Sequence, residues 1–341
     1  MASPNLSEIV TTTLRNRSGR LADSVTRNNA VLTRLTSRGK QKPFSGGRTI
    51  VQEIEYANNR TYQRYSGYQL LNIQPSDIFT AAEYPIRQSA VAVSISGLEM
   101  LQNAGREQVI ELLDGRITNA ERTFRNGLSY DAYSDGSLTG QITGLQALID
   151  TTPATGTVGG IDRSLWSFWQ NYAYGAVTDG GAAISPSNIY EYMLNVWTNT
   201  MRGPDQIDLI LADSTTWTAY NRSLHAIQRI TNTNSDVAKA GFKSLDFMGA
   251  DVVLDGGFQG STGDGNTFGS GGVGAVGGAP SGTMFFINSD YLYWRPHSQR
   301  NMVPLNPDRF SVNQDAMVKL IGWAGNMCAS GMIFHGVLYN S

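Results

Sequence analysis

The sequence has little cysteine, little histidine and no long apolar run. Its single cysteine, Cys328, excludes an intrachain disulfide framework and fits a protein made in a reducing compartment. No stretch approaches the roughly 20 consecutive apolar residues that a bilayer-spanning helix needs. The first ten residues also lack the basic-then-apolar pattern of a secretory signal. We therefore expect neither a membrane protein nor a secreted, disulfide-rich one.

Residue patterns that carry catalysis are also missing. His225, His297 and His335 do not share a metal-ligand spacing with one another or with Cys328. No serine lies in the glycine-flanked strand–turn–helix pattern of a hydrolase nucleophile. Ser214, at a predicted strand-to-helix turn, is interpreted as a helix N-cap. We predict no metal site and no catalytic residue, and hence a protein that is not an enzyme.

A glycine-rich segment, residues 256–282, contains two imperfect ligand-binding patterns. Residues 272–277 match the dinucleotide-binding fingerprint, but glycine and Pro280 follow, so no helix can begin where a pyrophosphate would bind. Asp264 and Asn266 have the spacing of a calcium loop without its terminal glutamate. We interpret the segment as a surface loop and predict no cofactor.

Charge is distributed unevenly along the 341 residues. The chain has a net charge of −2, yet residues 1–47 carry eight basic and two acidic residues, so the remainder is acidic. A basic arm on an acidic body can bind nucleic acid or another copy of that body, and the sequence leaves both open. The arm lacks aromatic residues before Phe44, which argues against base stacking. Its candidate contact residues are Arg15, Arg17, Arg20, Arg27, Arg34 and Arg38.

Residues 48–96 are predicted to form a long hairpin. In the first strand, one face is predicted to carry Ile50, Gln52, Ile54 and Tyr56 and the other Val51, Glu53 and Glu55, and alternation returns at residues 78–96. The tip between these strands is polar and rich in tyrosine and arginine, residue types that are enriched at protein interfaces. An ordinary surface loop is the alternative interpretation. The candidate intersubunit contacts on the tip are Arg60, Tyr62, Arg64, Tyr65 and Tyr68.

The rest of the chain mixes helices and strands. Residues 106–130 have the apolar periodicity of one long helix. Ser185 followed by Pro186 predicts the start of another helix. A buried strand at 207–212 leads into a helix at about 215–230. This order of elements predicts an α+β fold.

The C-terminal residues 316–341 are predicted to form two strands. Alternation marks the first strand over 317–322 and an apolar run marks the second over 332–338, with residues 323–326 between them. Further short strands are expected at 251–254, 283–288 and 291–295.

The sequential order of these features resembles the tailed-bacteriophage major capsid proteins of the Hong Kong 97-like fold. The resemblance covers nearly the whole chain and rests on order, because no single motif is diagnostic. The segments that carry it are GGRTIVQEIEYANNRTYQRYSGYQLLN, AEYPIRQSAVAVSISGLEML, NAGREQVIELLDGRITNAERTFRNGLSYDAY, IDLILADSTTWTAYNRSLHAIQRIT and MVKLIGWAGNMCASGMIFHGVLYN.

The resemblance implies a division of the chain into five parts. They are a basic N-terminal arm (1–47), an extended β-hairpin loop with peripheral-domain strands (48–96), a spine helix of the peripheral domain (97–135), an axial domain with the glycine-rich loop 256–282 (136–315), and C-terminal strands (316–341). Some members join subunits through a lysine in the extended loop. Residues 49–104 contain no lysine, so we expect no such cross-link.

The function implied by the resemblance is a major capsid protein that self-assembles into an icosahedral shell around phage DNA. Expected partners are further copies in hexamers and pentamers, portal, scaffold or decoration proteins, and packaged double-stranded DNA bound non-specifically, with no membrane. The expected location is the virion, after assembly in the host cytoplasm. The alternatives are an encapsulin-like nanocompartment shell protein and a soluble α+β enzyme.

Overall fold

The structure is a computed structural model, and it describes residues 29–98, 106–224, 244–255, 279–310 and 316–341. Its helices are α2 (Ala30–Ser37), α4 (Arg106–Tyr133), α5 (Leu145–Leu148), α6 (Ile189–Thr200) and α7 (Ser214–Ser223), with short 3₁₀ helices η1 (Ser167–Trp169) and η3 (Ser289–Tyr291). Its strands are β1 (Thr49–Glu55), β2 (Phe79–Pro85), β3 (Arg87–Ser96), β4 (Thr157–Val158), β5 (Ile161–Asp162), β6 (Tyr172–Gly175), β7 (Leu209–Ala212), β8 (Ser244–Phe247), β9 (Ala250–Leu254), β10 (Thr283–Ile287), β11 (Leu292–Pro296), β12 (Val303–Phe310), β13 (Ala316–Ala329) and β14 (Gly336–Tyr339).

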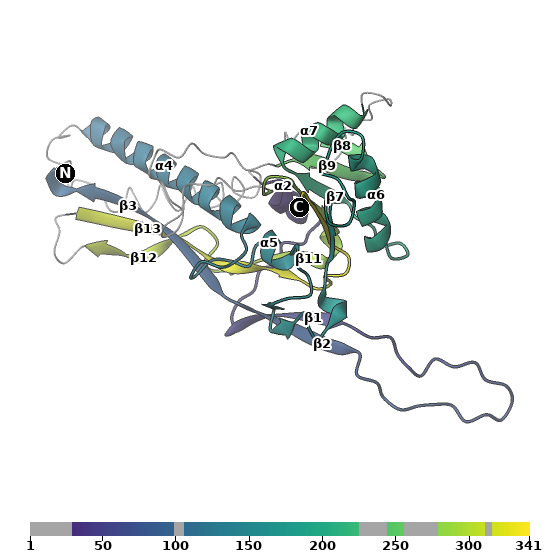
Figure 1. The fold of residues 1–341 in the computed structure, drawn as a ribbon. Coiled ribbons are helices and arrows are strands. Elements are labelled where there is room, and N and C mark those ends of the chain that lie inside the picture. The colour runs from purple at the N-terminus through teal and green to yellow at the C-terminus, as the bar shows by residue number, and fades with distance from the viewer. Residues whose placement is uncertain (1–28, 99–105, 225–243, 256–278, 311–315) are drawn as a thin grey trace.

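One part of the molecule is built on a six-stranded sheet in the order β6-β14-β10-β7-β9-β8 (Figure 1). The pairs β14–β6 and β7–β9 are parallel, and the others are antiparallel. Helix α6 packs on β14 and β6, and α7 packs on β7 and β9. The fully apolar strand β7 is buried at every position, as expected for a central strand.

The other part is built on a long antiparallel sheet in which β13 is the central strand. Strands β11 and β12 pair with successive portions of one edge of β13, and β3 pairs with its other edge over ten residues. Helix α4 lies along β3 (Figure 1) and buries Ile117, Ala120, Phe124 and Leu128. The predicted long helix and its apolar stripe are confirmed over these residues. The mixed helix-and-sheet class is confirmed as well.

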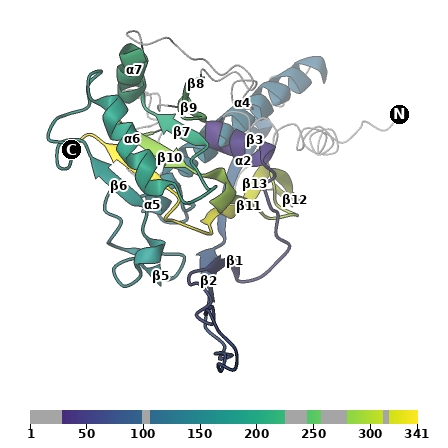
Figure 2. The ribbon, with the colours of Figure 1, turned by 90° about the vertical axis from the view of Figure 1, so that its right-hand side faces the viewer.

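The predicted hairpin is formed by β1 and β2, which pair antiparallel from Thr49 opposite Pro85 to Glu55 opposite Phe79. Ile50, Ile54, Ala82 and Tyr84 point to the body and are buried, while Val51, Glu53 and Glu83 on the other face are exposed. Figures 1 and 2 show this hairpin on the opposite side of the long sheet from α2 and α4. The alternation in the sequence therefore predicted the first strand and its buried face correctly. The returning strand was predicted to continue to residue 96 within the hairpin, but only β2 pairs with β1, because β3 pairs with β13 of the long sheet.

Residues 29–44, which the sequence assigned to the basic arm, pack on the chain's own body. Helix α2 buries Val31, Leu32 and Leu35 in the core around the long sheet. Residues 41–44 then run beside β11, where Lys42 N donates to Trp294 O at 3.0 Å. The apolar spacing in this segment is therefore satisfied within the chain.

Two helix starts differ from the sequence interpretation. The N-cap of α7 is Asp213, whose carboxylate accepts hydrogen bonds from the Thr215 and Thr216 amides, so Ser214 is the first helical residue. A carboxylate there also interacts favourably with the helix dipole. Helix α6 begins after Asn188, because the Asn188 side chain binds the backbone of Ser185 and Ala183 and holds these residues in a turn.

The closing strands also differ from the prediction. Strand β13 continues through residues 323–326, because Asn326 and Gly325 pair with Arg295 and Pro296 of β11. The second strand starts at Gly336, later than predicted, and it belongs to the six-stranded sheet. The last 26 residues thus connect both sheets, which the sequence pattern did not indicate.

Two glycines give a matched test of the packing at α4. A Cβ at Gly144 would lie 2.3 Å from Ser134 O, so the backbone at Ser134 would have to shift to make room for it. A Cβ at Gly115 would meet nothing within 4 Å. We expect Gly144→Ala to lower the free energy of unfolding by at least about 2 kcal/mol. Gly115→Ala should raise it by about 1 kcal/mol, the difference in helix propensity. Guanidinium unfolding of the unassembled chain measures both, and equal effects would contradict the packing described.

Candidate intersubunit surface

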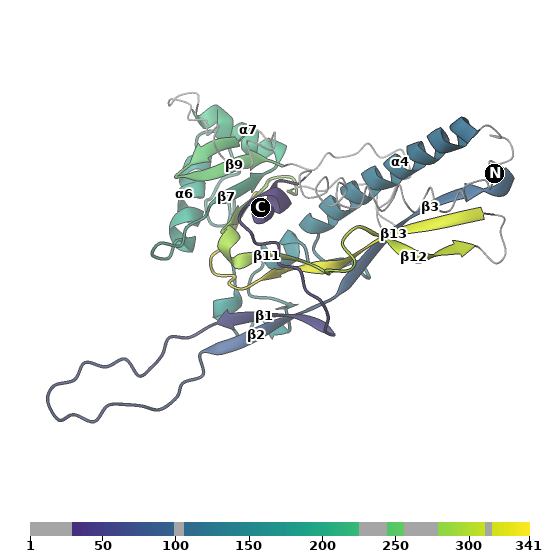
Figure 3. The same cartoon turned by 180° about the vertical axis from the view of Figure 1, so that it is seen from behind.

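The segment that joins β1 to β2, residues 57–78, projects from the body without secondary structure of its own (Figures 1 and 3). All five predicted contact residues of the tip lie on it and are exposed. The hydrogen bonds of the segment's side chains are local, such as Ser66 N to Gln69 Oε1 at 3.2 Å. The structure therefore brings the predicted residues together on one projecting segment.

The tip also carries aliphatic residues that the sequence interpretation missed. Leu70 and Ile73 have relative exposures of 98% and 88%, close to the 107% of the predicted contact Tyr68. Leu71 is half exposed. Their signal in the sequence was a short apolar cluster inside an otherwise polar segment. Isolated exposed apolar side chains are ordinary, but several on one projection indicate a surface that a partner covers.

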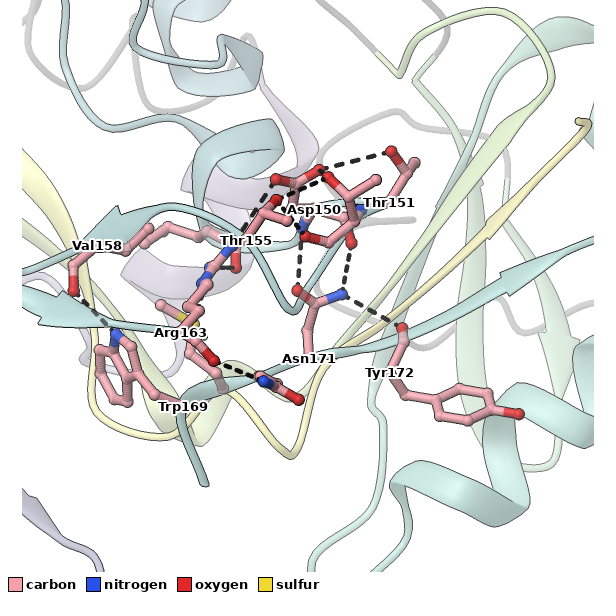
Figure 4. A network of polar contacts seen from close by, with 12 residues as sticks. Asp150, Thr151, Thr155, Val158, Arg163, Trp169, Asn171 and Tyr172 are labelled. Atoms are coloured by element: carbon pink, nitrogen blue, oxygen red, sulfur yellow. Dashed lines mark hydrogen bonds and ion pairs between the residues drawn. The ribbon is translucent and has the colours of Figure 1, made fainter. Parts of the chain in front are cut away.

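Beneath the hairpin, residues 150–172 form a support, drawn in Figure 4. Asp150 and Asn171 join its ends through two backbone–side-chain hydrogen bonds of 3.0 and 2.8 Å. Arg163 is fully buried, donates to Leu148 O, and lies 4.0 Å from the Asp150 carboxylate. Burial lowers the pKa of Arg163, and the charge of Asp150 acts in the opposite direction. Trp169 Nε1 donates to Val158 O at 2.9 Å and fixes the β4–β5 turn.

The hairpin rests directly on this support. Glu83 N donates to Gly159 O at 2.9 Å, and a Cβ at Gly159 would lie 2.8 Å from the Ala82 side chain. The Tyr84 hydroxyl donates to Ala329 O at 3.3 Å and accepts from Ala329 N at 3.2 Å, which ties β2 to β13. Burial raises the pKa of Tyr84 strongly, so its hydroxyl stays protonated. The base of the hairpin is therefore fixed although its tip is exposed.

The arginines of the N-terminal arm divide into two groups. Arg15, Arg17, Arg20 and Arg27 lie outside the described residues. Arg34 is buried and pairs with Asp251, and its Nε lies 3.9 Å from Asp208. Arg38, whose side chain is 41% exposed, pairs with Asp208 at 3.3 Å. For these two residues the structure gives partners within the chain, in place of the expected contacts with other molecules.

At the other end of α2, three elements meet at Asp255, the residue after β9. Its Oδ2 accepts hydrogen bonds from Ala30 N, at 3.2 Å, and from the Tyr133 hydroxyl at the end of α4. Asn29 caps α2 and donates to Ser129 Oγ of α4 at 3.1 Å. Burial raises the pKa of Asp255 to about 6, and the two hydrogen bonds act against that rise. The start of the N-terminal segment is thus bound to both parts of the molecule.

The histidines that the structure describes are part of the packing. His335 is buried, its Nδ1 accepts from Asn288 N at 3.3 Å, and burial lowers its pKa to about 3, so it is neutral. His297 packs edge-on against Phe44. His225 and the glycine-rich patterns at 264–277 lie outside the described residues. Within the described ranges no three potential metal ligands lie together, and no helix is long and apolar enough to span a bilayer.

Searches with the sequence and with the structure gave different results. No family model and no curated protein matches the sequence. Among solved structures, a chain of the cyanophage A-1(L) capsid matches with a TM-score of 0.57 at 14% identity, covering 88% of each chain. The capsid of the native GTA particle matches with a TM-score of 0.50 at 11% identity, covering 91% of this chain and 90% of that one. A chain of Gordonia phage Cozz matches with a TM-score of 0.50 at 11% identity, covering 91% and 86%.

The fold is that of a viral shell subunit. More specifically, it is the fold of phage capsid proteins, and the similarity extends over nearly the whole chain. The resemblance found in the sequence is confirmed at the level of the fold.

The junction at Asp255 predicts a specific pH dependence. Because the folded pKa of about 6 exceeds the ordinary value of 3.8, ionisation of Asp255 opposes folding. Its effect is absent below about pH 4, grows as the pH rises to about 6, and is constant above that. Asp255→Asn retains an oxygen for both hydrogen bonds and cannot ionise. We expect this variant to exceed the wild type in stability by up to roughly 3 kcal/mol above pH 6, and to match it near pH 4.

Guanidinium unfolding of the unassembled chain between pH 4 and 7 measures this difference. Asp77→Asn, which removes an exposed carboxylate, is the control and should follow the wild type. A difference between wild type and Asp255→Asn that does not vary with pH would contradict the assignment.

Proposed function

We propose that the chain is the major capsid protein of a tailed bacteriophage, which assembles as hexamers and pentamers into an icosahedral shell around double-stranded DNA. The observation that carries this proposal is the projecting segment 57–78, whose apolar side chains are left exposed by the described part of the chain. The fold it shares with phage capsid proteins supports the proposal. The protein would be made in the host cytoplasm and become part of the virion.

The proposal assigns a role to each part of the molecule. Helix α4 and the long sheet would be the spine helix and peripheral domain, and the six-stranded sheet with α6 and α7 would be the axial domain around which capsomers form. The hairpin would be the extended loop that overlies a neighbouring subunit. Residues 1–28 would remain as an arm for contacts with sister subunits, a scaffold or packaged DNA. Portal and decoration proteins are proposed as further partners.

The direct test is electron microscopy of the purified, concentrated protein. Icosahedral particles are the expected result, and a protein that stays monomeric at 37 kDa would contradict the proposal. Mass spectrometry and nucleic-acid analysis of the particles then separate two kinds of shell. Phage DNA supports a capsid, whereas a co-purifying cargo enzyme supports an encapsulin-like compartment.

Deletion of residues 58–76 should leave a folded, soluble chain that forms small species and no shells. The hairpin strands and their support lie outside the deletion, so unfolding by guanidinium should be unchanged within about 0.5 kcal/mol. A second variant replaces the same residues with glycine and serine at equal length. If the tip side chains make the contact, it too fails to assemble. Intact shells from either variant would count against the role of the tip.

A smaller change tests the aliphatic residues of the tip. Leu70→Ser with Ile73→Ser should raise the protein concentration needed for assembly by at least about tenfold, because burying each side chain contributes roughly 1.5–3 kcal/mol. Stability of the unassembled chain should not change, since both side chains are exposed there. Val177→Ser, at another exposed apolar residue, is the control. Sedimentation velocity measures the assembled fraction, and equal effects of both variants would contradict the prediction.

A further inference from the structure

The outer face of the β1–β2 hairpin has a distinctive composition. On this face Glu55 lies opposite Phe79, Glu53 opposite Ala81, and Val51 opposite Glu83. Two of these pairs join a carboxylate to a large apolar side chain, and the two strands contain no basic residue. The result is a flat surface that is both acidic and apolar.

This face is not covered by the described part of the chain. Phe79 is 68% exposed and Val51 is 51% exposed. None of the described residues forms an ion pair with Glu53 or Glu55, and Glu83 accepts one long hydrogen bond, 3.4 Å, from Thr49 Oγ1. Arg48, at the edge just before β1, is the nearest basic residue in sequence. Antiparallel strands commonly leave one polar face in water, but here the open face carries large apolar side chains beside the carboxylates, a composition that is typical of a surface covered by a partner.

The charge complement of this face lies in residues 14–27, whose sequence is LRNRSGRLADSVTR. This stretch carries four arginines against Asp23, and Leu14, Leu21 and Val25 recur at helical spacing. An amphipathic segment with this composition offers apolar residues to Phe79 and Val51 and guanidinium groups to the carboxylates. Arginine forms planar, bidentate bonds with carboxylates and is weakly hydrated, which suits an interface.

The downstream part of the arm is not available for this contact. Arg34 and Arg38 are paired with Asp208 and Asp251, and α2 is anchored at Asp255. Figures 1 and 2 place α2 and the hairpin on opposite sides of the long sheet. The body therefore separates the start of α2 from the hairpin of the same chain, which favours the hairpin of another copy.

We infer that the acidic outer face of the hairpin, formed by Glu53, Glu55 and Glu83 with Val51 and Phe79, binds the basic segment 14–27 of a neighbouring copy. This inference rests on the proposed shell function and identifies the surface that receives the arm. It makes the hairpin a two-sided element, with the inner face on its own body and the outer face on a neighbour's arm.

The first experiment measures the contact without requiring particles. The acceptor is the full chain with Arg17→Glu and Arg20→Glu, which removes competition from its own arm, and the probe is a fluorescent peptide of residues 1–28. We expect saturable binding by anisotropy that weakens with salt. Adding Glu53→Arg and Glu55→Arg to the acceptor should weaken binding by about tenfold or more. Absence of binding, or equal binding to both acceptors, would overturn the inference.

A matched control separates this surface from net charge. Asp135→Arg with Glu191→Arg changes the charge of the acceptor equally at two exposed carboxylates outside the hairpin. Binding should stay within about twofold of the starting acceptor. An equal loss in the control would overturn the inference, because attraction would then depend on net charge alone. The milder variant Glu53→Gln with Glu55→Gln replaces the arginine variant if that one does not fold.

The second experiment distinguishes a neighbour's arm from the chain's own. A chain with the reversed face (Glu53→Arg, Glu55→Arg) and a chain with the reversed arm (Arg17→Glu, Arg20→Glu) should each assemble poorly alone. Co-expressed, they should form mixed particles, because each arm then fits the other chain's face. A third chain carries all four substitutions. If this chain assembles while the two co-expressed chains do not, the arm contacts the face of its own chain, and the inference is overturned. Failure of the wild type to form particles, with peptide binding intact, would instead count against the shell function alone.

Discussion

The pairing of β3 with β13 is the constraint on which the arrangement of the molecule depends. Residues 79–96 form β2 and β3 with a break only at Ile86, so one nearly continuous strand belongs first to the hairpin and then to the long sheet. Asn326 of β13 reinforces the break by donating to Pro85 O at 2.9 Å. The direction in which the hairpin leaves the body is therefore set by the register of the long sheet. The base of the hairpin is held in place by this sheet even though its tip is exposed.

A second polar junction joins the two sheets through α2. Arg34 bridges toward Asp251 in β9 and Asp208 beside β7, while Asp255 binds the helix start and the end of α4. Removing one partner from a buried pair leaves an uncompensated charge, which costs several kcal/mol. Such pairs specify geometry more than they add stability. Here the geometry they specify is the placement of α2 between the elements of both sheets, a short distance along the chain from the arm.

The sequence predicted the elements whose pattern is local. Alternation at Ile50 and Ile54 located the hairpin and its buried face, and the stripe through Ile117 and Phe124 located α4. Errors arose where a long-range contact decides the outcome. The basic residues Arg34 and Arg38 are bound by acidic residues more than 150 positions away, and β13 continues because Asn326 and Gly325 pair with β11. The N-cap of α7 is Asp213, one residue before the predicted Ser214. Differences of one or two residues are usual where a helix boundary is assigned.

The tip residues were partly predicted and partly missed for the same physical reason. Tyrosine and arginine are enriched at interfaces, so their residue types alone made them candidates. Leu70 and Ile73 are distinguished only by their exposure, and a sequence does not show what covers a side chain. Only a few tip side chains can become buried in each contact, and each contributes roughly 1.5–3 kcal/mol to the free energy of association. This gain must offset the translational and rotational freedom that is lost when two subunits associate. One such contact would be weak. In the proposed closed shell the contact would be repeated around every subunit, so weak contacts on a rigid base would suffice together, while each would still permit correction of an incorrectly placed copy.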